Sequence, residues 1–143
     1  GREALELLRS SAPGAVALSS FPIFRMPLHA TALGKALLAF AGDEVFQRVV
    51  GIRKTLPRYT QHTNIDPVQL KAGLREVREL GYARSEQETR IGQVCVAVPV
   101  LGEGSGVVAA ISISGTVERF RPQYYPDLLQ KLFKASKEIG RCL

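Results

Sequence analysis

The sequence contains few cysteines and histidines, the residues that form disulfide bonds and bind structural metal ions. Only two cysteines, Cys95 and Cys142, occur in 143 residues. A chain of this length can bury a core of its own, so a disulfide scaffold is not expected and a reducing compartment is favoured. The cysteines and the two histidines, His29 and His62, lack the short paired spacings of metal ligands. We therefore expect a cytoplasmic protein without a metal or a cofactor.

Long apolar runs are also missing. The longest charge-free stretch covers residues 10–24 and contains two prolines, a glycine and four serines, so it cannot form a membrane span of about 20 apolar residues. The first residues include Arg2, Glu3 and Glu6, which do not fit the basic start and apolar run of a secretory signal. The sequence predicts no membrane association.

What is present is an ordinary globular composition. Hydrophobic residues make up 45% and charged residues 22%, which excludes a disordered tail, a collagen-like repeat and a coiled coil, and the length predicts a single domain over residues 1–143. The net charge of +6 is concentrated only at Arg48, Arg53, Lys54 and Arg58. This cluster fits a solvated basic loop or a nucleic-acid contact, although no helix-turn-helix pattern or aromatic interleaving accompanies it.

The periodicity of apolar residues predicts an α+β fold. A helix is expected from Thr31 to Ala41, and it is apolar on nearly all sides. Lys35 is its only charged residue and is expected to be exposed, and Thr31 is its expected cap. A further helix begins at the N-cap Asp66, with Gln69 as capping-box partner, and ends at Gly81. We also expect helices over 2–9, 43–50 and 127–143 and strands over 15–18, 93–100 and 107–114.

The last two strands predict an antiparallel hairpin whose two faces differ in bulk. One face carries branched aliphatic residues and is expected to be dry core, whereas the other carries mainly small residues, including Cys95, Ser112 and Ser114. Such a face leaves room for a helix or a ligand. If the helix that starts at Thr31 points its N-terminus at this face, the free amides near Ala32 and Leu33 would attract a carboxylate.

An enzyme would use Cys95 as a nucleophile with His29 or His62 as base, but no motif ties either histidine to the thiol and no oxyanion-hole motif stands nearby. We expect no catalytic residue, although a small cysteine-dependent enzyme remains an alternative. Glu86 and Glu88 fit either a solvated turn or carboxylates near a pocket mouth that receive a ligand hydroxyl or a basic side chain.

Three segments resemble, in order and spacing, the C-terminal effector-binding domain of IclR-family bacterial transcription regulators. They are MPLHATALGKALLAF at 26–40, LREVRELGYARSEQETRIGQVCVAVPV at 74–100 and AAISISG at 109–115, and KASKEIGRCL at 134–143 is similar to the last helix of that domain. The resemblance implies a GAF-like domain with a curved antiparallel sheet flanked by helices. It also implies that the domain senses a small metabolite, often a carboxylate, in a homodimer or homotetramer.

In that family the ligand lies between the start of the buried helix and the strands that bear cysteine and serine. Matched onto this sequence, the resemblance implies that seven residues bind the ligand, namely Ala32, Leu33, Ser85, Glu86, Cys95, Ser112 and Ser114. Ser85 stands where the family often has an acidic residue, and residues 1–25 are shorter than the usual leading region. DNA binding would depend on a separate domain that these residues do not contain. A ligand-free oligomerisation domain is a further alternative.

Overall fold

A three-stranded antiparallel sheet forms the centre of the molecule. The computed structural model describes residues 3–5, 7–8, 10, 25–52, 55–104 and 106–143. The sheet has the order β3-β4-β5 and its strands are β3 (Ala83–Glu86), β4 (Gln93–Leu101) and β5 (Val107–Thr116). The predicted hairpin of β4 and β5 is confirmed, with an irregularity in register between Val100 and Leu101.

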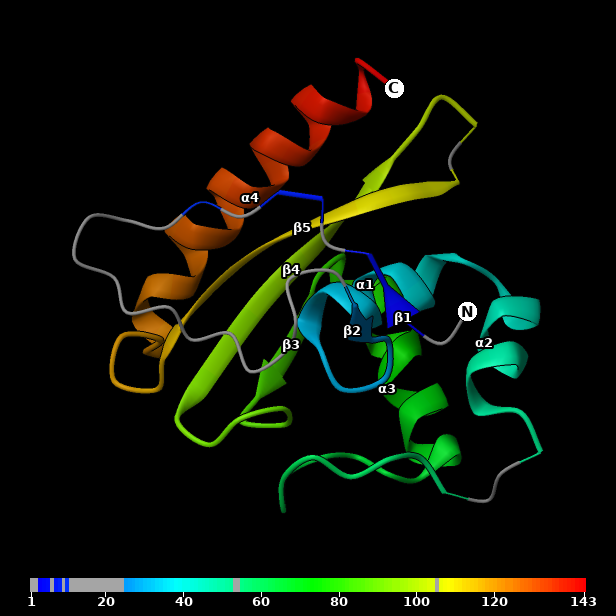
Figure 1. The fold of residues 1–143 in the computed structure, drawn as a ribbon. Coiled ribbons are helices and arrows are strands. Elements are labelled where there is room, and N and C mark those ends of the chain that lie inside the picture. Colours follow the sequence, from blue (N-terminus) through cyan, green and yellow to red (C-terminus); the bar gives the residue numbers. More distant parts are fainter. Residues whose placement is uncertain (1–2, 6, 9, 11–24, 53–54, 105) are drawn as a thin grey trace.

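Helices cover both faces of this sheet, as Figure 1 shows. The helix α4 (Tyr125–Gly140) follows the short 3-10 helix η1 (Pro122–Tyr124) and packs against one face, whereas α1 (Ala32–Phe40) packs against the other. The helix α3 (Pro67–Leu80) lies on α1, and α2 (Asp43–Val50) follows α1 directly. The fold is therefore α+β, as predicted.

Bulk along the hairpin determines which helix covers which face. Val96 and Val98 are fully buried in a cluster with Leu132 of α4, whereas Cys95 and Ala110 pack against the cluster that contains α1. The branched face is dry core on β4, as expected, but on β5 Ile111 is only half-buried and Ile113 is exposed. The small face is the one that α1 approaches. Removal of apolar area from water at about 25 cal/mol per Å² makes the α4 side a main source of stability.

The end of α4 lies close to the sheet because of a glycine. A side chain at Gly140 would overlap the carbonyl oxygen of Leu101, and Ser136 Oγ donates a hydrogen bond of 2.5 Å to the Pro99 carbonyl. The face of α4 that packs on the sheet therefore includes Ser136 and Gly140, whereas Ile139 is exposed. Pro99 itself lies beyond the end of β3, where only β5 pairs with β4 among the described residues.

The start of α3 confirms one predicted cap and corrects another. Asp66 Oδ1 accepts a hydrogen bond from the Val68 amide at 2.8 Å, and Gly81 ends the helix with a φ of 77°. The backbone N–H of Asp66, however, donates to Asn64 Oδ1 instead of to Gln69. An Asx turn from the preceding loop has replaced the capping box.

The helix predicted over residues 2–9 is wrong. Glu3–Ala4 forms the strand β1, which pairs antiparallel with β2 (Met26–Pro27). A helix of eight residues has little stability of its own, so a tertiary contact that buries Ala4 overrides the local pattern. The strand predicted over 15–18 lies outside the described residues. Within the described part of the chain, no helix is both long enough and apolar enough to cross a membrane.

Candidate functional site

The small face of the sheet is built from residues that stand opposite one another on the three strands. Ser85 pairs with Cys95, and Cys95 pairs with Ser114, so these three side chains form a row across the sheet. A second row beside it consists of Ala83, Ala97 and Ser112. Directly paired residues project from the same face. The strand register therefore places four of the seven predicted ligand-binding residues together.

The first turn of α1 is held against this face by Ser85. The Ser85 hydroxyl is 4% exposed and donates a hydrogen bond of 2.8 Å to the carbonyl of Ala30. Thr31 caps the helix as predicted, since its Oγ1 accepts from the Gly34 amide at 3.0 Å. Among the described residues, no acceptor pairs with the N–H of Ala32 or Leu33. Two unpaired amides at a helix N-terminus favour an anion.

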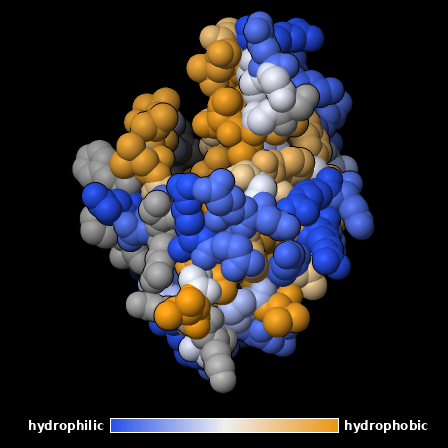
Figure 2. Space-filling view, turned by 90° about the vertical axis from the view of Figure 1, so that its right-hand side faces the viewer, coloured by the Kyte–Doolittle hydropathy of each residue, from blue (hydrophilic) through white to orange (hydrophobic). Residues whose placement is uncertain are grey.

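The small face is covered at one end and open at the other. Ala97 and Ser85 are buried beneath α1, Cys95 is half-buried, and Ser112 and Ser114 on β5 are exposed. Figure 2 shows apolar side chains gathered toward the top of the face of the molecule that it presents. The candidate site is therefore a shelf beside the start of α1, and its outer part is accessible.

Glu86 does not join the other predicted residues. It follows Ser85 in β3, so its side chain lies on the other face of the sheet, where it forms an ion pair with Arg84. Arg84 also lies over the ring of Tyr125, 4.7 Å from its centroid, on the α4 side. The strand register therefore brings together Ser85, Cys95, Ser112 and Ser114, α1 with Ala32 and Leu33 packs against the same sheet, and Glu86 lies on the other face.

Lys35 was predicted to be exposed, and the structure corrects this. Its side chain is only 15% exposed and forms an ion pair with Glu88, and its Nζ also donates to the Arg84 carbonyl at 3.1 Å. Burial raises the pKa of the Glu88 carboxyl above its ordinary value, and the charge and hydrogen bond of Lys35 counter part of that rise. Of the two alternatives for Glu88, the structure supports a carboxylate that receives a basic side chain.

A second anchor for α1 was not foreseen from the sequence. His29 Nε2 lies 2.9 Å from the Pro57 carbonyl, its ring is 5.8 Å from that of Tyr59, and Thr31 Oγ1 donates to the Pro27 carbonyl at 2.8 Å. Burial lowers the pKa of the His29 imidazole below its usual 6.5. A neutral ring that donates to a carbonyl therefore joins the loop after α2 to the turn before α1.

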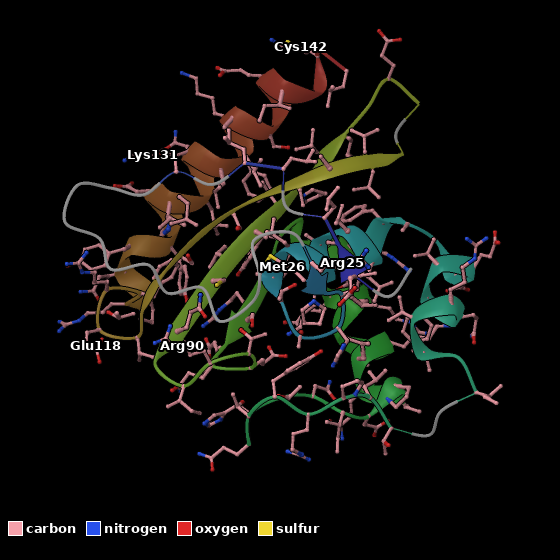
Figure 3. The ribbon with its side chains drawn as sticks, viewed as in Figure 1. Arg25, Met26, Arg90, Glu118, Lys131 and Cys142 are labelled. Carbon is pink, nitrogen blue, oxygen red and sulfur yellow. The ribbon has the colours of Figure 1, made fainter. Side chains whose placement is uncertain are left out.

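The remaining cysteine and the basic cluster lie outside this shelf. Cys142 follows the end of α4, which covers the opposite face of the sheet (Figure 3). Arg48 forms an ion pair with Glu44 on α2, and Arg58 donates to the Gln61 carbonyl. Arg53 and Lys54 are not among the described residues. Within the part of the chain that the structure describes, no three His, Cys, Asp or Glu side chains gather as a metal site.

Comparison with known proteins supports the family that the motifs suggested. The family model described as bacterial transcriptional regulator IclR C-terminal matches residues 8–141. The transcriptional repressor IclR of Escherichia coli is 35% identical over 115 residues, which are 80% of this chain and 42% of the repressor. The repressor AllR of Escherichia coli is 38% identical over 119 residues, covering 83% of this chain and 44% of AllR. The chain thus spans less than half the length of these relatives.

Solved structures show the same fold. The inducer-binding domain of PobR from Acinetobacter, a double mutant crystallised with 3-hydroxybenzoic acid, has a TM-score of 0.84 at 28% identity and covers 99% of this chain and 83% of its own. IclR of Thermotoga maritima has a TM-score of 0.82 at 29% identity, with 99% of this chain and 58% of its own covered. These proteins are regulators and not enzymes, in agreement with the expected lack of catalysis. The chain belongs to the family of C-terminal domains of IclR-type bacterial transcriptional regulators.

Proposed function

We propose that the chain is the effector-sensing domain of a longer regulator and that it binds a small carboxylate on the shelf beside α1. The observation that supports this proposal is the hydrogen bond from Ser85 to the Ala30 carbonyl, which joins the small face to the turn directly before α1. The carboxylate accepts hydrogen bonds from these amides and from Ser112 or Ser114. Cys95 contacts the rest of the ligand.

The chemistry of the shelf supports an anion. Its two rows consist of small uncharged residues, so no carboxylate competes with the ligand for the helix amides. The dipole of α1 adds partial positive charge at its N-terminus. In addition, the PobR inducer-binding domain was crystallised with a carboxylic acid, 3-hydroxybenzoic acid. A small carboxylate is therefore the ligand class that we propose for this chain.

The proposed output is a change in a separate winged helix-turn-helix domain, with this chain acting in a homodimer or homotetramer. Effector binding can change the arrangement of attached domains only if the effector binds two states with different affinity. The buried Lys35–Glu88 pair links α1 to the segment after β3, so a shift of α1 is passed to that edge of the sheet.

Calorimetry with a panel of small aliphatic and aromatic carboxylates, each paired with its neutral amide, tests the proposal. At least one acid is expected to bind and its amide to bind more weakly. Ser114→Ala or Ser112→Ala should weaken binding by roughly tenfold to a hundredfold, because a lost hydrogen bond to a charged group is worth about 1.5 to 3 kcal/mol. Thr55→Ala removes an exposed residue's hydroxyl that belongs to neither row of the small face and should leave binding unchanged. Equal binding by both serine variants and the unmodified protein would contradict the site.

A further inference from the structure

A groove separate from the shelf runs between α3 and the outer edge of β3. It has a volume of about 380 Å³, with Gln69, Gly73 and Glu76 of α3 on one side and Tyr82, Arg84 and Glu86 on the other. Lys35, Asn64 and Glu88 also line it. Of the residues predicted to bind the carboxylate effector, only Glu86 belongs to this groove. A ligand here would therefore be distinct from that effector.

The groove has room for an aliphatic ligand. A side chain added at Gly73 would meet no heavy atom within 4 Å, so the helix wall is open at that position. Leu80 is 48% exposed at the groove, and Val77 lies one turn before it on the same helix. These side chains give the groove an apolar wall against which a short hydrocarbon chain can pack.

The groove is lined by one carboxylate more than the number of its cations. Lys35 pairs with Glu88, and Arg84 pairs with Glu86. Glu76 also lines the groove, and within the described ranges no cation forms an ion pair with it. Three carboxylates therefore stand against two cations, a balance that favours a cationic ligand.

Glu88 provides an independent indication of a missing donor. The residue is 8% exposed and its Oε1 accepts from Lys35. A hydrogen bond from the Asn64 backbone also lowers the pKa of this carboxyl, but among the described residues no donor meets hydrogen-bond geometry at the buried Oε2. A buried carboxylate oxygen without a donor is destabilising, and a donor supplied by a ligand removes that penalty.

We propose that this groove is a second ligand site, specific for a small primary ammonium compound with a short hydrocarbon chain. The ammonium group donates to Glu88 and is attracted by Glu76, while the hydrocarbon chain packs against Leu80. The proposal does not depend on the carboxylate effector, because the two sites have different linings and opposite charge preferences.

Titration of the 143-residue protein with n-butylamine, 1-butanol and butyrate, followed by amide NMR, tests the proposal. The amine should produce saturable shifts at Gly73 and Leu80 and bind at least about tenfold more tightly than the alcohol, because its hydrogen bond is charge-assisted. Butyrate should not bind in the groove. Equal shifts for the amine and the alcohol would overturn the proposal, because they would show that the groove does not recognise the charge of the ammonium group.

Two variants locate the site. Gly73→Leu fills open space on a helix, so it should keep the fold while weakening amine binding by at least about tenfold. Glu88→Gln should remove the preference for the amine over the alcohol, and Glu103→Gln, in the turn of the hairpin, is its matched control and should bind normally. Because Glu88→Gln leaves Lys35 without its partner and can unfold the protein, Gly73→Leu decides the test. Unchanged amine affinity in Gly73→Leu would refute the site.

Discussion

The two faces of the sheet contain strands of the same hairpin but do different work. On the α4 side, Val96 and Val98 are fully buried against Leu132 and exclude water. On the α1 side, the paired residues are alanine, serine and cysteine, and the row ends in exposed hydroxyls on β5. One face stabilises the fold through apolar burial. The other buries less apolar area and instead has accessible polar groups beside a helix N-terminus.

The largest expected difference between the faces is in stability. Leu132→Ala on α4 should lower the free energy of unfolding by about 2 to 5 kcal/mol, because it leaves a cavity against the buried valines. Ser112→Ala on the small face should change it by less than about 0.5 kcal/mol, because that side chain is exposed. Urea unfolding of both variants checks this, and equal losses would show that the faces contribute alike.

A smaller effect is expected from two glycines that occupy helices on the α1 side. Gly34→Ala should destabilise the protein by about 1 to 3 kcal/mol, because the added carbon would overlap the backbone of Leu28. Gly73→Ala, whose added carbon meets nothing, should stabilise it by roughly 0.5 to 1 kcal/mol through helix propensity. Thermal unfolding distinguishes the two, and a stabilising Gly34→Ala would contradict the close approach of α1 to that turn.

The smallest effect concerns pH and the anchor before α1. Because burial lowers the folded-state pKa of His29 below 6.5, the unfolded chain binds a proton more readily at acidic pH. The free energy of unfolding should therefore fall as the pH drops below about 6.5, the ordinary pKa of histidine. Above that pH, His29 should have no effect on the pH dependence of stability. His29→Gln keeps a donor for the Pro57 carbonyl and should have a flatter stability profile between pH 7.5 and 5.5. If the stability of the variant depended on pH as steeply as that of the unmodified protein, another group would cause the loss of stability at acidic pH.

Local patterns were sufficient to predict the hairpin, its two faces and the caps at Thr31 and Asp66. These features depend on alternation and on hydrogen bonds within a few residues, so the sequence specifies them directly. The row of Ser85, Cys95 and Ser114 was predicted only in part, because the register of β3 against β4 is a long-range property. The resemblance to the family supplied Ser85, whereas the contrast in bulk had selected the other two.

Two of the incorrect predictions, those for Lys35 and for residues 2–9, involve tertiary contacts. The sequence predicts that Lys35 faces solvent on its helix, yet Glu88, 53 residues later in the chain, pairs with it. Residues 3–4 form a strand because Met26–Pro27 lies beside them. Neither Glu88 nor Pro57 could be assigned as a partner by spacing, because loop closure brings these residues into place and no local periodicity records it.

The central claim is that the first turn of α1 and the small face bind one carboxylate together. Amide NMR during titration with the tightest-binding carboxylate of the panel tests it most directly. The account predicts that the signals of Ala32, Leu33, Ser112 and Ser114 shift along a single binding curve, while that of Val98 on the branched face does not move. Shifts confined to the α3 groove or to the α4 side, with Ala32 and Leu33 unchanged at saturation, would contradict it.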